Sequence, residues 1–279
     1  MTMRTRWILL LICGCLAAAT LYSIEGQSKT PPAIVEVPDF EYSFNKDEVF
    51  EESNEANLVS PYWWLDSGGK LLIQSGIGST ITGDLPSDDP WRRAYATTNP
   101  VDTDDGAHPQ NVFRLVSRLE WDNPRVEAAF RIRRDNLSHS PNRRESNGLF
   151  VMSRYVDSDN LYYTGIRVDG HAVIKKKFAG VYYTLAEAVL YSGAYHRESA
   201  PSLLPHEEWI YLRSETTTDT NGTVRISLAL REATSEEWRT VLATTDVGED
   251  TPAITKSARI GLRTDFMDVE FGPILVDEL

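Results

Sequence analysis

The segment from His108 to Arg114 gathers side chains that could neutralise a carboxylate. His108, Gln110, Asn111 and Arg114 all stand within this one short stretch. An arginine guanidinium is a rigid fork that pairs with carboxylates and sulfates, and amide and imidazole groups add further hydrogen bonds. The pattern indicates a site for an anionic ligand. In the alternative reading, His108 is an ordinary loop histidine before Pro109, and both readings stay open.

Two acidic segments offer hard oxygen ligands. Asp102, Asp104 and Asp105 precede Gly106, and a similar cluster spans Asp157–Asn160. Ca²⁺ binds such oxygens, but neither segment has the full spacing of a calcium loop, and turn formation explains both. We therefore expect no required cofactor, with Asp102, Asp104 and Asp105 as the candidate ligands if Ca²⁺ is used.

Three short strands in succession must position these groups. Leu149–Tyr155, Leu161–Val168 and Ala172–Phe178 are joined by segments rich in Asp, Asn, Ser and Gly, which form tight turns. The middle strand alternates, with Tyr162 on an apolar face and Tyr163 on the opposite one. A meander of this kind is part of a sandwich.

Further strands follow the same pattern from Asn111 to the C-terminus. They are predicted at Val112–Leu119, Val126–Arg133, Trp209–Glu215, Val224–Leu230, Trp238–Ala243, Arg259–Thr264 and Val269–Val276. Before them, the pattern predicts a strand at Leu71–Ile73 and a long loop at Asp84–His108. Leu185–Val189 is the one candidate helix. Many short strands separated by hairpin turns predict an all-β antiparallel β-sandwich of the jelly-roll type.

Several predicted strands carry arginine and aromatic residues at alternate positions, and therefore on one face of the strand. The residues are Arg131, Tyr163, Arg167, Trp209, Tyr211, Arg213 and Arg263. We expect them to line one trough, where rings stack on sugars and guanidinium groups bind acidic groups. In the alternative, these arginines merely keep a convex surface soluble. Further candidate substrate contacts are Trp63, Trp64, Arg154, Lys176, Tyr195, His196 and Arg197.

The N-terminus predicts export. Residues 1–25 combine Arg4 and Arg6 with an apolar run too short to span a bilayer comfortably, which is typical of a signal peptide. Cys15 could carry a lipid, or cleavage could follow Ala17–Ala19, so we expect a secreted protein or an outer-envelope lipoprotein. Residues 26–39 are read as a linker and 40–279 as a single jelly-roll domain.

Composition excludes several classes of protein. The chain has 279 residues and a net charge of −13, so wholesale nucleic-acid binding is disfavoured. Its two cysteines, Cys13 and Cys15, both lie in the signal segment, which leaves the mature domain without a disulfide, a thiol nucleophile or a cysteine-rich zinc site. No Walker loop, dinucleotide fingerprint, G-x-S-x-G elbow or H-E-x-x-H motif is present.

Three segments carry a family resemblance. NGLFVMSRYVDSDNLYYTGIRVDG, AVIKKKFAGVYYTLA and RIGLRTDFMDVEFGPILV resemble the concanavalin A-like lectin/glucanase superfamily, and the order of elements is similar to its alginate-lyase-like members. Met152-Ser153-Arg154 departs from the Gln-x-His triplet of those lyases, and Arg263 with Asp265 replaces a tyrosine. The Glu-x-Asp-x-x-Glu strand of the glucanases has no match; Asp265, Asp268 and Glu270 form the nearest carboxylate cluster.

The face of arginines and aromatic residues, together with the fold that the resemblance implies, leads us to expect a protein that acts on an extracellular, acidic polysaccharide. As a lyase it would use Arg114 with Gln110 or Asn111 to neutralise a uronate, and Tyr163, His108 or the Tyr195–Arg197 run to move protons. A non-catalytic, lectin-like protein is the second reading, and a glycoside hydrolase is the third. A membrane would be contacted only through lipid at Cys15.

Overall fold

The computed structural model describes residues 39–54 and 60–279. The chain divides into two units, Met1–Val37 and Pro38–Leu279, and the description that follows concerns the second. The predicted signal segment, Cys15 and nearly all of the predicted linker lie outside the described residues. Within the described ranges, no helix is both long enough and apolar enough to cross a membrane.

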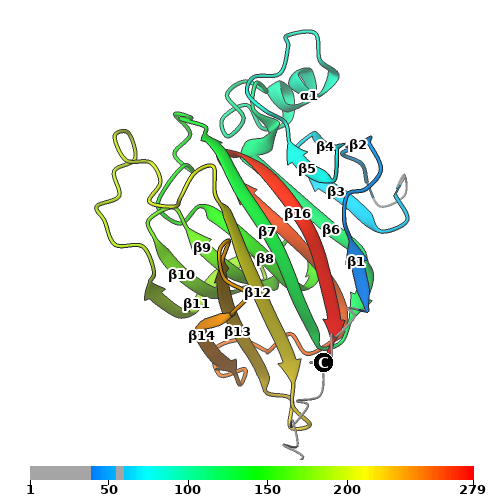
Figure 1. Cartoon of the computed structure of the whole chain (residues 1–279), viewed down its shortest axis with the longest axis vertical. Helices are drawn as coiled ribbons and strands as arrows, with labels where there is room; N and C mark the ends of the chain where they lie inside the picture. The colour runs from blue at the N-terminus through cyan, green and yellow to red at the C-terminus, as the bar shows by residue number, and fades with distance from the viewer. Residues whose placement is uncertain (1–38, 55–59) are drawn as a thin grey trace, which may run out of the picture. The chain divides into compact units, whose positions relative to one another are not determined.

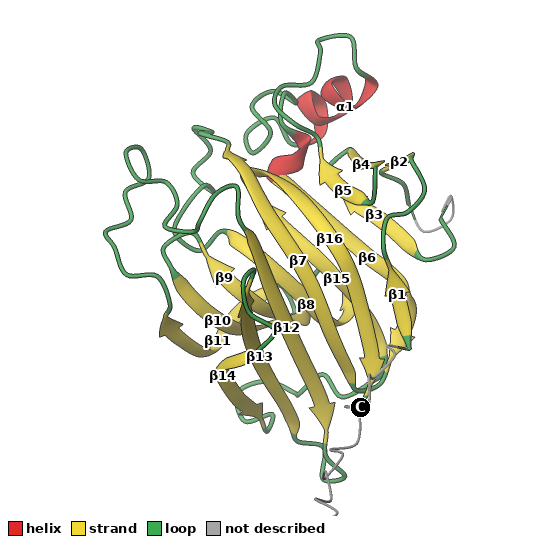
Figure 2. Ribbon diagram, viewed as in Figure 1, coloured by secondary structure: helices red, strands yellow, loops and turns green. Residues whose placement is uncertain are grey.

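Two antiparallel sheets build the second unit (Figures 1 and 2). In the described residues, the large sheet has the order β14-β13-β12-β7-β16-β5-β4-β2, with β1 paired to β16. Its strands are β1 (Phe40–Tyr42), β2 (Glu48–Glu51), β4 (Lys70–Gln74), β5 (Ile77–Thr80), β7 (Pro124–Asp135), β12 (Trp209–Thr218), β13 (Val224–Glu232), β14 (Arg239–Asp246) and β16 (Met267–Glu278).

The small sheet lies behind the large one in the view of Figure 1 and has the order β11-β10-β9-β8-β15-β6-β3. Its strands are β3 (Trp63–Ser67), β6 (Val112–Trp121), β8 (Gly148–Asp157), β9 (Asn160–Arg167), β10 (His171–Phe178), β11 (Val181–Val189) and β15 (Ala258–Asp265). The predicted fold class, an antiparallel β-sandwich of the jelly-roll type, is confirmed.

Aromatic rings from both sheets meet in the core between them. Phe113 of β6 stacks on Phe271 of β16 with ring centroids 5.2 Å apart, and Phe130 of β7 meets Phe271 edge-on at 5.8 Å. All three side chains are fully buried. Since offset and edge-on aromatic pairs add to the stabilisation from burial alone, this trio joins the two sheets strongly.

The small sheet also buries much of its outer face. Tyr162 points into the core between the sheets, whereas Tyr163 joins a second apolar cluster on the opposite face. That cluster also holds Phe150, Met152 and Val173, and it confirms the alternation predicted for the middle strand. Both faces of the small sheet are therefore ordered by side-chain packing.

Two sequence predictions about local structure are wrong. The expected loop at Asp84–His108 contains the helix α1 (Pro90–Thr98), which Asp89 caps by accepting a hydrogen bond from the Trp91 amide at 2.8 Å. Pro90 suits the first helical position because its missing N–H would have no partner there. Leu185–Val189, expected as a helix, belongs to β11, because pairing with β10 overrides its helix-favouring composition.

We predict that Phe271→Ala destabilises the fold by about 3–5 kcal/mol, because it opens a cavity between the sheets and removes two ring contacts. Urea denaturation followed by fluorescence measures the loss. The exposed loop variant Val247→Ala is the control and changes the free energy of unfolding by no more than about 0.5 kcal/mol. Equal effects of the two variants would contradict the proposed role of the ring trio.

Candidate functional site

The outer face of the small sheet brings cations and rings together. Register sets Arg263 of β15 directly beside Arg114 of β6 and Phe150 of β8, and it sets Lys175 of β10 beside Tyr163 of β9. Like charges side by side repel. Asp265 pairs with Arg263 and Asp66 pairs with Arg114, which offsets that repulsion. We call this surface the basic–aromatic face; it comprises Arg114, Phe150, Tyr163, Lys175, Tyr182 and Arg263.

A cavity of about 530 Å³ opens on the basic–aromatic face. Strand residues on its wall are Phe150, Tyr163, Arg167, Lys175, Tyr182, Arg263 and Asp265. The segment 142–147 completes the wall and contributes Arg144, Glu145 and Asn147. Because most of these side chains stand on paired strands, their positions are well fixed.

Arg263 is held by three neighbours within this cavity. Its Nη1 donates to the hydroxyl oxygens of Tyr163, at 3.0 Å, and Tyr182, at 3.2 Å. Its Nε donates to Oδ1 of Asp265 at 2.9 Å. The Tyr163 and Tyr182 rings also stack, with centroids 6.0 Å apart. One guanidinium therefore fixes two phenol oxygens in one place.

The pKa values of the two phenols are shifted in opposite directions. Burial raises the pKa of Tyr163, which is only 2% exposed, to about 12, although the Arg263 charge opposes that shift. Tyr182 is 50% exposed. Burial also favours the neutral form of Tyr182, but the Arg263 and Lys177 cations outweigh it and hold the pKa of Tyr182 below its ordinary value. Two groups with pKa values moved apart are a typical arrangement for proton transfer.

Other cations in the cavity differ in how far they are neutralised. Arg167 pairs with Asp169 and, at 2.9 Å, with Glu187, so two carboxylates balance its charge. Burial, followed by repulsion from Arg167, lowers the pKa of Lys175. The exposed side chain of Arg144 adds a further cation to the wall.

Most of the predicted carboxylate-neutralising residues serve as scaffold. His108 lies between Asp104 and Asp84, at 2.9 and 2.8 Å. Gln110 is fully buried and donates to the Gly83 carbonyl and to Asp268. Asn111 does line the cavity, and its Nδ2 donates to the Asp102 carbonyl at 2.8 Å. Arg114 stands beyond the cavity wall, where it lies over the Tyr155 ring at 5.9 Å.

Three predicted substrate contacts are wrong because the side chains are buried. Trp63 alternates with Trp64 and enters the core between the sheets, where it is 2% exposed. Lys176 shares the inward parity of Ile174 and pairs with Asp246 at 2.7 Å. Arg154 would face outward by alternation from Met152. An irregularity in β8, with φ +50° at Arg154, turns it inward to donate to the Thr255 carbonyl at 2.6 Å.

The expectation of a single trough is also wrong. Arg131, Trp209, Tyr211 and Arg213 stand on the large sheet, whereas Tyr163, Arg167 and Arg263 stand on the small one. Both sets point away from the shared core, so they occupy opposite faces of the sandwich. Parity within a strand identifies an outward face, but it does not tell which sheet that strand joins.

The remaining predicted contacts lie outside the cavity lining. Trp64 stands near Arg259 on the outer side of the small sheet, with 5.8 Å between the guanidinium and the ring. Tyr195, His196 and Arg197 belong to the segment between β11 and β12, where Arg197 donates to the Ser140 carbonyl at 2.8 Å. Arg197 thereby joins this segment to the loop that carries Ser140.

The candidate calcium ligands make hydrogen bonds between loops. Asp102 accepts from Ser140 at 2.5 Å and from Asn142 at 2.9 Å, and Asp104 accepts from Ser138 at 2.7 Å. Asp105, at φ +53°, occupies a turn. Among residues 39–54 and 60–279, no three His, Cys, Asp or Glu side chains are grouped so as to hold a metal ion.

The carboxylates considered for hydrolysis are not assembled. Asp265 pairs with Arg263, and Asp268 is buried, where it accepts hydrogen bonds from Gln110 and Asn136. Glu270 pairs with Arg131 on the large sheet. The three carboxylates therefore have different partners and do not act together.

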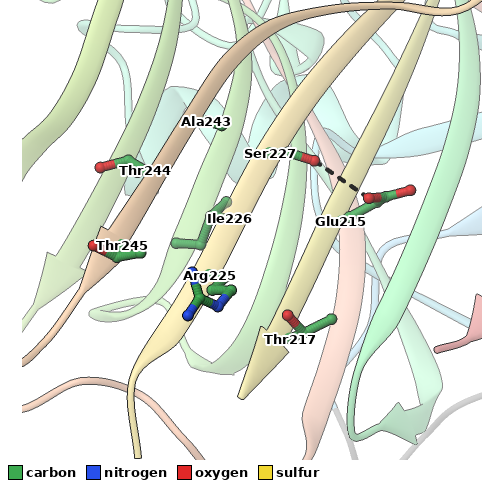
Figure 3. A pocket seen from close by; sticks show the side chains of 8 residues that line it. All are labelled: Glu215, Thr217, Arg225, Ile226, Ser227, Ala243, Thr244 and Thr245. Carbon is green, nitrogen blue, oxygen red and sulfur yellow. Dashed lines mark hydrogen bonds between the residues drawn. The ribbon is translucent and has the colours of Figure 1, made fainter. Parts of the chain in front are cut away.

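A separate depression of about 480 Å³ lies on β12, β13 and β14 (Figure 3). Its lining residues are Glu215, Thr217, Arg225, Ile226, Ser227, Ala243, Thr244 and Thr245. They include no aromatic ring, and Asp219 binds Arg225 at 2.7 Å. The depression therefore lacks the combination found on the basic–aromatic face and provides sites for control substitutions.

Among the tyrosine, lysine and arginine side chains that line the cavity, sequence reasoning missed Tyr182, Lys175 and Arg144. Tyr182 was overlooked because β11 was not recognised beyond its helical-looking end, and Lys175 was passed over for Lys176. Arg144 lies in an irregular segment without a periodic pattern. Alternation along Lys175–Lys177 could have identified Lys175, since it shares its parity with Val173 rather than with the core residue Ile174.

No family model matches the chain, and no curated protein matches it. Among solved structures, the carbohydrate-binding module CBM66 from Bacillus subtilis is similar at 14% identity and a TM-score of 0.43, over 61% of this chain and 83% of that one. The GH43 protein BlXynB from Bacillus licheniformis is similar at 10% identity and a TM-score of 0.46, over 89% of this chain and 41% of that one. The marine PL-14 alginate lyase from Aplysia kurodai is similar at 8% identity and a TM-score of 0.41, over 88% of this chain and 100% of that one.

The chain spans only about two fifths of the GH43 protein. At such identities and TM-scores, the likeness carries no argument about the ligand or the reacting residues of this chain.

We predict that Arg263→Gln raises the pKa of Tyr182, because the cation that most strongly opposes the effect of burial is removed and Lys177 remains. Titration of the ¹³C-labelled tyrosine ring by NMR measures the change. Arg225→Gln, in the depression of Figure 3, is the control and leaves the pKa of Tyr182 in place. An unchanged pKa in Arg263→Gln would show that Arg263 does not set it.

Proposed function

We propose that the protein is a secreted lyase that cleaves a uronate-containing polysaccharide by β-elimination at the basic–aromatic face. One observation carries this proposal. A single guanidinium binds two phenol oxygens whose pKa values move apart, within a cavity that also contains Lys175 and Arg144. Elimination requires such a combination of proton-transfer groups and cations.

These positions support the following reaction. Lys175 and Arg144 bind the uronate carboxylate, which makes the neighbouring C5 proton more acidic. Tyr182 as phenolate takes that proton, the C4–C5 double bond forms, and the bond from C4 to the glycosidic oxygen breaks. The phenol then gives the proton to the departing oxygen, so the proton balance closes on one residue. Buried Tyr163 and Asp265 keep Arg263 directed at Tyr182.

We predict that Tyr182→Phe lowers the elimination rate by about 100-fold or more, because the variant keeps the ring but loses the proton carrier. Absorbance of the unsaturated product measures the rate on alginate and on glucuronan. Tyr62→Phe, a matched change at an exposed tyrosine outside the cavity lining, serves as the control and retains full activity. If Tyr182→Phe keeps the wild-type rate, the assignment of Tyr182 is wrong.

The pH profile provides an independent test. A base must be deprotonated to act, so the rate rises with pH as Tyr182 ionises, and the rise lies below the ordinary tyrosine pKa of about 10. Arg263→Lys weakens the hold on the phenolate and moves the rise to higher pH. A rising limb at the same pH in Arg263→Lys and wild type contradicts the role given to Arg263.

A second candidate function is carbohydrate binding without cleavage. The charges of Arg167 and Arg263 are balanced by Asp169, Glu187 and Asp265, and a rigid, balanced wall suits a binding site. Retention of the protein on a uronate polymer with neither new absorbance nor new reducing ends would favour this function. New reducing ends without absorbance would favour a hydrolase instead.

A further inference from the structure

The large sheet carries a second group of aromatic residues, on the opposite face of the sandwich. Arg131 lies 4.6 Å from the Trp209 ring centre, Arg231 lies 3.9 Å from that of Tyr211, and Arg213 lies 4.3 Å from that of Trp238. We call this group the Arg–aromatic ladder; it comprises Arg131, Trp209, Tyr211, Arg213, Arg231 and Trp238. Guanidinium stacking holds each ring in one orientation.

A cavity of about 770 Å³ adjoins the ladder where β12 begins and β13 ends. Trp209, Trp238 and Arg231 belong both to the ladder and to the cavity wall. Tyr191 adds a third ring from the segment that follows β11. Two indoles and a phenol therefore border one hollow.

The charges here differ from those of the first cavity. Glu270 binds Arg131 at 2.6 Å and Glu127 binds Arg213 at 2.8 Å, so these ladder cations are already neutralised. The cavity wall itself carries Glu208, Glu232 and Glu237 against Arg231 and Arg239. Three carboxylates face two cations, and an anionic polymer would be repelled rather than attracted.

Uncharged sugars fit this combination of groups. The apolar faces of pyranose rings stack on indoles, and sugar hydroxyls donate hydrogen bonds to carboxylates such as those of Glu232 and Glu237. A ring that is already fixed loses little conformational entropy on binding, which favours affinity. The depression in Figure 3 lies on the same strands and lacks rings, so the aromatic residues are what distinguish the second cavity.

We propose that the cavity beside the Arg–aromatic ladder binds a neutral polysaccharide, independently of the basic–aromatic face. The protein then binds a neutral polysaccharide on the large sheet and an acidic polysaccharide on the small sheet. The inference does not depend on whether the basic–aromatic face is catalytic.

Native affinity electrophoresis tests the proposal with gels that contain soluble xylan, mixed-linkage β-glucan or alginate. Xylan or β-glucan should retard the wild-type protein, and Trp238→Ala or Trp209→Ala should weaken that binding by about tenfold or more. Thr217→Ala, in the ring-free depression, is the control and should bind as the wild type does. Tyr182→Phe should also leave binding to the neutral polymers unchanged, and Trp238→Ala should leave any alginate cleavage unchanged.

Intrinsic tryptophan fluorescence gives a second readout that does not rely on alanine variants. Xylo-oligosaccharides or β-gluco-oligosaccharides should shift the emission of the wild-type protein, and Trp238→Phe should reduce the shift while the ring platform is kept. The proposal is overturned if neither neutral polymer retards the wild-type protein. It is equally overturned if both tryptophan variants bind like the wild type, or if Thr217→Ala or Tyr182→Phe causes the same loss.

Discussion

The register of β9 between β8 and β10 determines which side chains of β9 face the core and which face outward. Tyr162 points inward, where its hydroxyl donates to Asp246 at 2.7 Å, and Asp246 also accepts from Lys176. Tyr163, the next residue, points outward to Arg263. A slip of one residue would turn each of these tyrosines to the other face, so it would disturb either the pairing of the buried Asp246 or the aromatic contact to Arg263. Packing and chemistry therefore depend on the same alignment.

Long strands with regular alternation could be predicted from the sequence. The strands that became β7 to β10, β12, β13, β15 and β16 were all expected close to their observed bounds. Their turns carry Gly, Asn and Asp, and their apolar parity is unbroken over most of their length. The sandwich follows from that pattern alone.

The site was harder to predict than the strands. Whether Arg263 and Arg213 share a surface depends on the partners of β15 and β12, and those partners lie far away in the chain. Arg154 was misplaced because a local irregularity reverses the alternation, and Tyr182 was missed because β11 has a mixed composition and gains its structure from β10. Each failure reflects a tertiary contact that no local pattern encodes.

Tyr182 stands on β11, the last strand of the small sheet, which pairs with β10 on one side. Strands at the margin of a sheet separate at lower free energy than central ones, so the phenol is borne by an edge strand while Arg263 is borne by an inner one. Departure of β11 would carry Tyr182 away from its cation and restore an ordinary, protonated phenol. The reactivity of Tyr182 therefore depends on the pairing of β11 with β10. A ligand that contacts both strands would strengthen that pairing while it is bound.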